Sequence, residues 1–202
     1  IAIIGVVFFH ANLFSYGYLG VDVFLVIAGY FTTKSIVRQF DNGGFSYLNF
    51  LEERLVRLYP LLIIISIISL LLGYFTMLPT NYKNTAETVV GTSLFVNNIV
   101  QYITASDYWD ASNEYKPLMH TWYIGVVFQF YVLYPLFFIG AYHFTKKWKR
   151  VVGVLLAIAG LASLLLYVLP IFDTAFHFYL LPSRFFEFIA GGLLVLVPTG
   201  EG

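Results

Sequence analysis

Long apolar runs separated by short polar segments dominate the chain. A helix that crosses a bilayer core of roughly 30 Å needs about 20 apolar residues. The pattern predicts five spans, the last of which only begins, at residues 18–37, 61–78, 121–142, 151–169 and 185–197. Residues 1–11 are apolar apart from His10 and predict the outer half of one further helix. We therefore expect an all-α polytopic transmembrane helical bundle with about six helices in this chain.

The connector between the first two full spans is polar. It covers residues 38–57 and contains the turn signal Asp-Asn-Gly-Gly at residues 41–44. Residues 46–59 predict an amphipathic helix that enters the membrane. Pro60 would then open the next helix, since a first helical turn tolerates proline.

The basic residues predict the orientation of the spans. Short cytoplasmic loops concentrate lysine and arginine. One connector is flanked by Lys34, Arg38, Arg54 and Arg57, and the other contains the run Lys146-Lys-Trp-Lys-Arg150. Counting the spans puts these two segments on the same, cytoplasmic side. The polar stretch 79–119 then forms an extracytoplasmic loop, in which residues 86–104 favour either a short amphipathic helix or a half-buried one.

Composition supports the membrane assignment. Of the 202 residues, 59% are hydrophobic and 11% are charged, whereas soluble domains carry about 25% charged residues. The formal net charge is zero, so a global field that attracts nucleic acid is excluded. The chain has no cysteine, which excludes disulfides, cysteine-ligated zinc and a thiol nucleophile. Both ends lie in or near apolar runs, and we expect residues 1–202 to be one transmembrane domain that continues beyond both ends.

The predicted topology places ionisable residues at two levels of the bundle. Near the outer ends of their helices lie His10, Asp22, His120, Arg184 and Glu187. Near the inner end of theirs lie Arg54 and Arg57. Ionisable groups inside hydrocarbon are costly and usually face a bundle interior or a water-filled cavity. This two-level layout is the main functional signal that the residues give by themselves.

His10 is the first candidate for catalysis because it follows the apolar residues 6–9. Imidazole titrates near neutral pH, so it can take a proton from a hydroxyl group and return it to a leaving group. The alternative is a buried histidine that bonds to a neighbouring carbonyl. Asp22 opens the second span, where it either orients an imidazole or caps the helix end.

Two further pairs are spaced three residues apart and so share a helix face. Arg54 and Arg57 present guanidinium forks, which suit the phosphate groups of a nucleotide-bearing donor. Their alternatives are positive-inside anchoring and an ion pair between Glu53 and Arg57. Arg184 and Glu187 either neutralise each other as a buried pair or form part of a site wall.

His120 and Trp122 lie at the predicted membrane boundary. Trp and Tyr belong to the interfacial belt there, so Trp122 and Tyr134 are interpreted as anchors by default, and His120 is a candidate second site residue. No metal-ligand spacing appears, and no glycine-rich phosphate loop follows a strand. We therefore expect no metal and no permanently bound cofactor.

Four ordered strings carry a resemblance to a known family. They are Ile1-Ala-Ile-Ile-Gly-Val-Val-Phe-Phe-His10 with Gly17-Tyr-Leu-Gly-Val-Asp22, then Phe50-Leu-Glu-Glu-Arg54-Leu-Val-Arg57-Leu-Tyr-Pro60, then Lys116-Pro-Leu-Met-His120-Thr-Trp122, and Pro182-Ser-Arg184-Phe-Phe-Glu187-Phe-Ile-Ala-Gly191. The chain resembles the acyltransferase 3 family, the O-antigen acetylase-like integral membrane acyltransferases. The strings span almost the whole chain, so the match is more specific than any single motif.

The resemblance implies residue roles. His10 matches the essential histidine of the family, and Arg54 and Arg57 match its paired-arginine motif for the acyl donor. Recurrent family positions of less defined role are matched by Asp22, His120, Trp122, Arg184 and Glu187. One position departs from the family pattern, because Val127 stands where a glutamate is typical.

The resemblance also implies a function. Family members have about ten transmembrane helices, lie in the bacterial inner membrane and transfer an acyl group, usually acetyl from acetyl-CoA, to hydroxyl groups of cell-surface or lipid-linked carbohydrates. The lipid bilayer, acyl-CoA and a carbohydrate or glycolipid acceptor are the expected partners, without nucleic acid. The rivals are a glycolipid or ion transporter and a catalytically silent relative, an alternative that Val127 leaves open. The acceptor and the oligomeric state stay open.

Overall fold

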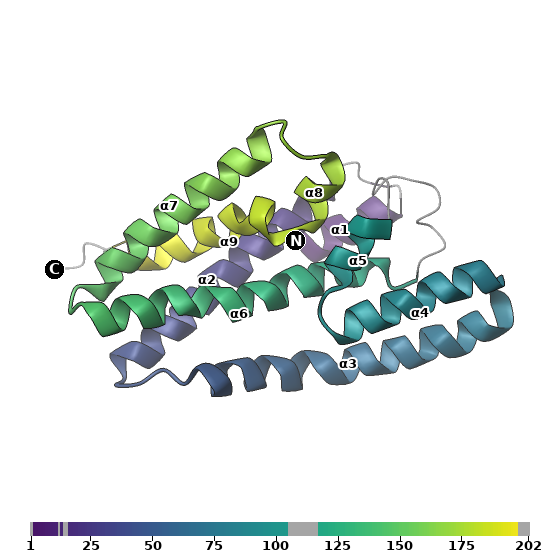
Figure 1. Cartoon of the computed structure of the whole chain (residues 1–202), viewed down its shortest axis with the longest axis horizontal. Coiled ribbons are helices and arrows are strands. Elements are labelled where there is room, and N and C mark those ends of the chain that lie inside the picture. The colour runs from purple at the N-terminus through teal and green to yellow at the C-terminus, as the bar shows by residue number, and fades with distance from the viewer. Residues whose placement is uncertain (1, 12, 14–15, 105–116, 198–202) are drawn as a thin grey trace. The chain divides into compact units, whose positions relative to one another are not determined.

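The computed structural model describes residues 2–11, 13, 16–104 and 117–197 (Figure 1). Within this part of the chain the secondary structure is helical, without strands. The elements are α1 (Ala2–His10), α2 (Leu19–Asp41), α3 (Tyr47–Thr76), α4 (Pro79–Ser93), α5 (Asn97–Thr104), the 3-10 turn η2 (Met119–Thr121), α6 (Trp122–Phe144), α7 (Trp148–Val168), α8 (Thr174–Tyr179) and α9 (Leu181–Leu196).

The predicted fold class, an all-α polytopic bundle, is confirmed. Five segments are long and apolar enough to cross a membrane: Leu19–Asp41, Tyr47–Thr76, Met119–Phe144, Trp148–Val168 and Thr174–Leu196. Each overlaps one of the five apolar runs that the sequence predicts to span, and four of the five runs extend one or two residues past the end of the segment. The chain is therefore a multi-pass membrane protein.

The chain divides into two compact units. Unit 1 comprises Ile1–Phe45, Tyr134–Leu165 and Arg184–Gly202, and unit 2 comprises Ser46–Leu133 and Leu166–Ser183. The expectation of a single transmembrane domain over residues 1–202 stays a prediction.

Helix α3 differs from its prediction. The amphipathic segment and the apolar span form one helix of 30 residues, about 45 Å long, which begins after Ser46, whose hydroxyl accepts from the Asn49 backbone N–H. Pro60 lies inside this helix, so the prediction that it opens a new one is wrong. Only the backbone hydrogen bond from position 60 to the Val56 carbonyl is lost, and helical periodicity continues on both sides.

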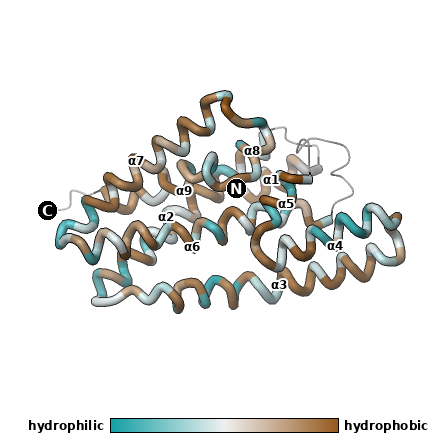
Figure 2. Tube along the Cα trace, viewed as in Figure 1, coloured by the Kyte–Doolittle hydropathy of each residue, from teal (hydrophilic) through white to brown (hydrophobic). Residues whose placement is uncertain are grey.

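In unit 2, α4 packs against α3 (Figure 1). Tyr59 Oη donates to the Ser93 carbonyl at 3.2 Å, so α4 runs antiparallel to the second half of α3. Helix α3 is apolar in this half, whereas hydrophilic residues recur along α4 (Figure 2). Within the polar stretch 79–119, Pro79–Ser93 and Asn97–Thr104 are helical, so the mixed residues 86–104 comprise the end of α4, a break at residues 94–96, and α5.

The break between α4 and α5 occurs at Phe95, which has a positive φ of 56°. This left-handed conformation is uncommon for a bulky residue. Tertiary contacts fix it, because the Phe95 ring stacks on Phe128 at 4.0 Å and the Phe95 carbonyl accepts from Gln129 Nε2.

In unit 1, α2 and α9 approach each other through glycines. A Cβ atom added at Gly29 would overlap the Phe188 carbonyl, and one added at Gly191 would overlap the Val26 carbonyl. Small residues at helix interfaces let backbones approach closely in membranes. This contact fixes the helices that carry Asp22 and Arg184.

We expect the substitution Gly29→Ala to destabilise the full-length protein by about 1–3 kcal/mol, because the added methyl group overpacks the α2–α9 contact. Gly153→Ala is the matched control, since nothing lies within 4 Å of its added Cβ, and alanine stabilises a helix interior by roughly 0.5–1 kcal/mol. Denaturant unfolding in detergent micelles measures both. Equal stability of the two variants would contradict the close approach.

Candidate active site

Three charged side chains meet in unit 1. Arg184, in the first turn of α9, donates from Nη1 to Asp22 Oδ1 at 2.6 Å and to Glu187 Oε1 at 3.0 Å. Asp22 belongs to the first turn of α2, so residues 162 positions apart are brought together. The side chains of Arg184 and Glu187 are 8% and 7% exposed, and that of Asp22 is 37% exposed. We call these three residues the charged triad.

The charged triad carries a formal charge of −1, from two carboxylates and one guanidinium. Glu187 Oε2 is buried and has no hydrogen-bond partner among the described residues. Burying an ion costs several kcal/mol unless a partner repays it, and ionisable residues at membrane depth are candidates for function. A buried ionic cluster that leaves one carboxylate oxygen unpaired is poorly suited to stability alone. It is therefore the best candidate site in unit 1.

The sequence predicts part of the charged triad. The ion pair of Arg184 with Glu187 is present in the structure, three residues apart on one helix. The capping interpretation of Asp22 is wrong, because Tyr18 is the N-cap residue of α2 and makes no side-chain cap. Asp22 instead binds the guanidinium of a distant helix. The sequence does contain a signal for this distant ion pair. Asp22 lies in an apolar span with no lysine or arginine within four positions, so any cationic partner has to come from another part of the chain.

His10 is the last residue of α1, which packs on α2 in unit 1. Its side chain lies outside the described part of the structure. Within the same helix pair, added Cβ atoms at Gly17 and Gly20 would overlap α1. The backbone of α1 therefore lies close to the start of α2, the element that carries Asp22.

Arg54 and Arg57 lie in the N-terminal half of α3, in unit 2. The Arg54 guanidinium lies 3.4 Å from the centre of the Phe50 ring and donates to the Phe50 carbonyl at 2.8 Å. Glu53 pairs with Arg54 at 3.4 Å, and the alternative pair of Glu53 with Arg57 does not occur in the described structure. Arg57 is exposed. Two cations of different exposure thus lie along one helix face.

His120 and Trp122 adjoin the start of α6. His120 is exposed in η2. Trp122 is only 3% exposed and packs on Phe178 and Tyr179 of α8. The interpretation of Trp122 as an interfacial anchor is therefore wrong. The same holds for Tyr134, which is fully buried in unit 1, where its hydroxyl bonds to Thr33 at 2.6 Å.

A buried amide cluster in unit 2 was missed from the sequence. Asn98 and Gln129 exchange hydrogen bonds at 2.8 and 3.2 Å, and Asn98 also donates to the Tyr179 carbonyl at 3.1 Å. Asn97 donates to Thr121 Oγ1 at 2.7 Å. The sequence did contain a signal for buried polar residues here, since both asparagines fall in the segment of mixed polarity at residues 86–104. These bonds join α5 to α6 and α8.

Val127 is 7% exposed in α6. It lies two positions before Gln129, and residues two apart on a helix do not share a face. The amide pair of Gln129 therefore does not replace the glutamate that the family pattern has at position 127.

Comparison with known proteins identifies the family. The family model described as an acyltransferase domain matches residues 1–198. The chain belongs to the acyltransferase 3 family. The resemblance carried by the four sequence strings is confirmed, and the chain carries an integral membrane acyltransferase domain.

Several relatives of this acyltransferase 3 chain are bacterial. Peptidoglycan O-acetyltransferase OatA of Listeria monocytogenes is 26% identical over 204 residues, which cover 98% of this chain and 32% of OatA. A Staphylococcus aureus (strain COL) protein provisionally named an O-acetyltransferase is 30% identical over 141 residues, 67% of this chain and 23% of that protein. An uncharacterised Haemophilus influenzae protein is 27% identical over 184 residues, 87% of this chain and 73% of that protein.

The chain spans about a third or less of the two relatives with acetyltransferase names. No solved structure is a significant match to it.

Proposed function

We propose that this protein is an inner-membrane O-acyltransferase that moves an acetyl group from acetyl-CoA to a hydroxyl group of a cell-surface or lipid-linked carbohydrate. The observation that carries the proposal is the acyltransferase match along residues 1–198, together with relatives named O-acetyltransferases. Peptidoglycan, the polymer in the name of OatA, supports a carbohydrate as the class of acceptor. The charged triad supports chemistry at membrane depth rather than a purely structural bundle.

In the proposed reaction, His10 takes the proton of the acceptor hydroxyl as its oxygen attacks the thioester carbonyl. The new C–O ester bond forms, the C–S bond breaks, and the CoA thiolate takes the proton from the imidazolium. The alternative route has the imidazole nitrogen attack first, so that the acyl group is carried briefly on His10 before the acceptor hydroxyl displaces it. Both routes give the ester and free CoA.

Arg54 and Arg57 are the proposed binding site for the phosphates of acetyl-CoA. Arg57 is exposed and makes no ion pair in the described structure. Arg54 is held by the Phe50 ring and carbonyl, which restricts its rotamers before the donor binds. A fixed fork loses less entropy on binding a phosphate than a free side chain does. Contacts on α3 thus support a preorganised donor site.

Asp22 is the proposed orienting group for the reacting imidazole. Arg184 holds one carboxylate oxygen of Asp22, while the side chain stays 37% exposed and able to accept from a second partner. A carboxylate in this role fixes the tautomer of a catalytic histidine and stabilises its charged form. Glu187 fixes Arg184 in turn. His120 and Trp122, which lie in unit 2, stay predicted participants in the reaction.

The test supplies acetyl-CoA with a labelled acetyl group to membranes that carry the full-length protein. The amount of label recovered in membrane or envelope glycan should be well above the amount recovered with membranes that lack the protein. Carbohydrate release and digestion of the label-bearing fraction would identify the acceptor class. A transporter would move substrate without acyl-CoA, and a silent relative, as Val127 allows, would transfer no label. Absence of transfer from an intact, membrane-inserted protein overturns the proposed function.

A further inference from the structure

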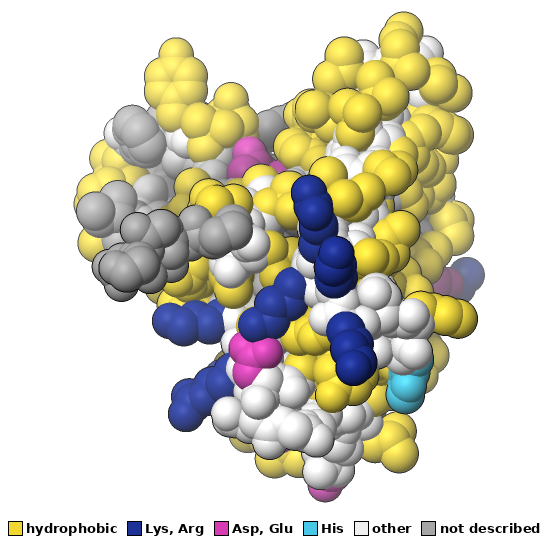
Figure 3. All heavy atoms as spheres, turned by 90° about the vertical axis from the view of Figure 1, so that its left-hand side faces the viewer, with side chains coloured by type: hydrophobic (Ala, Val, Ile, Leu, Met, Phe, Trp, Pro, Cys, Tyr) yellow, Lys and Arg dark blue, Asp and Glu magenta, His cyan; other side chains and the backbone are white. Residues whose placement is uncertain are grey.

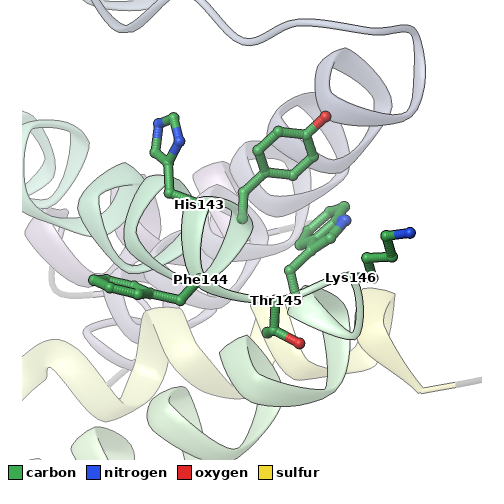
Figure 4. A pocket seen from close by; sticks show the side chains of 6 residues that line it. His143, Phe144, Thr145 and Lys146 are labelled. Atoms are coloured by element: carbon green, nitrogen blue, oxygen red, sulfur yellow. The ribbon is translucent and has the colours of Figure 1, made fainter.

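A hollow in unit 1 lies where α6 turns into α7. Its volume is about 490 Å³, and it is lined by Tyr142, His143, Phe144, Thr145, Lys146 and Trp148 (Figure 4). The lining combines three large aromatic rings with a lysine and a histidine. Aromatic rings with adjacent cations provide both an apolar wall and a site for a negative group.

The residues that line the hollow pack against the C-terminal end of α2. The Phe40 ring packs on Tyr142 and Trp148, at 4.6 and 5.3 Å between ring centres. Lys149 Nζ binds Asp41 Oδ2 at 2.8 Å. These contacts join the last turn of α2 to the first turn of α7, so the basic residues of the two helices lie at the same end of unit 1.

This end of unit 1 has a large excess of positive charge. Six exposed cations belong to it, Lys34, Arg38, Lys146, Lys147, Lys149 and Arg150. Among the described residues here, Asp41 is the acidic partner, and it neutralises Lys149. Six cations and one carboxylate leave a charge of +5. Lysine and arginine side chains gather on the corresponding face in Figure 3. We call these six cations, with the hollow, the basic end.

Apolar side chains begin directly beside the basic end. Phe144, at the rim of the hollow, is 90% exposed, and Val154 and Ile158 on α7 are 55% and 61% exposed. Helix α7 is apolar along most of its length, and hydrophilic residues gather where it begins (Figure 2). Because α7 is one of the candidate membrane spans, basic residues at its start suit the level of the lipid headgroups.

We propose that the basic end binds the phosphate headgroup of an anionic phospholipid, with the acyl chains along the exposed apolar side of α7. Positive-inside topology by itself explains scattered basic residues at a helix end. It does not explain an open hollow lined by Tyr142 and Trp148 beside Lys146, or an ion pair that holds two basic helix ends together. Basic pockets beside membrane helices bind anionic lipid headgroups. Each lysine or arginine near an anionic surface adds its own electrostatic attraction to the binding, and the contributions are of comparable size. The proposal is independent of the reaction that the protein catalyses.

The test is phosphatidylglycerol binding to the full-length protein in a zwitterionic detergent, counted by native mass spectrometry over a lipid titration. We expect Lys146→Gln, which removes a cation from the hollow, to weaken binding about fivefold. The triple variant Lys146→Gln, Lys147→Gln, Arg150→Gln should weaken it about a hundredfold. Lys83→Gln is the matched control, because it removes one exposed lysine from α4 in unit 2 and should leave binding unchanged.

Competition separates this lipid from other phosphate ligands. Phosphatidylcholine and inorganic phosphate should not displace bound phosphatidylglycerol. Displacement by acetyl-CoA that depends on Lys146 would assign the basic end to the donor and overturn the lipid proposal. Equal binding by Lys146→Gln and Lys83→Gln would overturn it as well, because attraction would then follow total charge and not this site. The melting temperatures of the variants, which change only exposed side chains, show that each is folded.

Discussion

Full-length protein with the substitution His10→Ala is expected to transfer no acetyl label above background while its amount in the membrane stays normal. General acid–base catalysis by a positioned side chain contributes typically 10²–10⁴-fold in rate, and loss of a covalent carrier removes the path entirely. The measurement is the initial rate of label transfer from acetyl-CoA to glycan, normalised to the amount of protein. Transfer at the wild-type rate would remove His10 from the mechanism.

A second histidine provides the control for this experiment. His177 lies in α8, where its ring bonds to the Phe172 carbonyl at 3.1 Å, and it has no place in the proposed reaction. His177→Ala should keep most of the transfer rate. Incubating wild-type protein with labelled acetyl-CoA but without acceptor separates the two routes. Label retained on wild-type protein and absent from His10→Ala favours the covalent carrier, and label on neither favours the general base.

The spans were predictable because membrane helices need about 20 consecutive apolar residues, a signal that a single sequence displays directly. The predicted ends of the helices were less accurate where the apolar pattern and a local helix breaker gave different answers. Pro60 is a strong local breaker, yet α3 continues through it because helical residues on both sides outweigh one lost backbone bond. The polar composition of α4 suggested a loop, although its threonines 85, 88 and 92 are buried and form a packed helix face.

The site was predictable as a list of residue types and not as an arrangement. Arg184 and Glu187 share a helix face, so their contact follows from a spacing of three. The contact between Asp22 and Arg184 depends on how α2 and α9 pack, and that packing rests on backbone approach at Gly29 and Gly191. Trp122 was placed at the membrane interface because tryptophan is common there. Its burial depends on α8, whose position the sequence does not display.

Removing the arginine from the charged triad should cost stability and activity together. We expect Arg184→Met to destabilise the full-length protein by about 3–5 kcal/mol, because two carboxylates lose their buried cation. Most of this loss comes from Glu187, since Asp22 is partly exposed. Unfolding in detergent micelles measures it. Lys83→Met, which breaks an exposed ion pair with Glu87, should cost under about 1 kcal/mol.

The triple variant Asp22→Asn, Arg184→Met, Glu187→Met separates the structural contribution of the triad from its functional one. Buried ion networks can be replaced by uncharged side chains of similar size with little loss of stability, or with a gain. We therefore expect the triple variant to recover stability to within about 1 kcal/mol of wild type, since no uncompensated charge remains. Its transfer activity should stay lost, because the proposed orienting carboxylate is gone. An active and stable triple variant would show that the three charges only hold α2 and α9 together, and would remove Asp22 from the proposed mechanism.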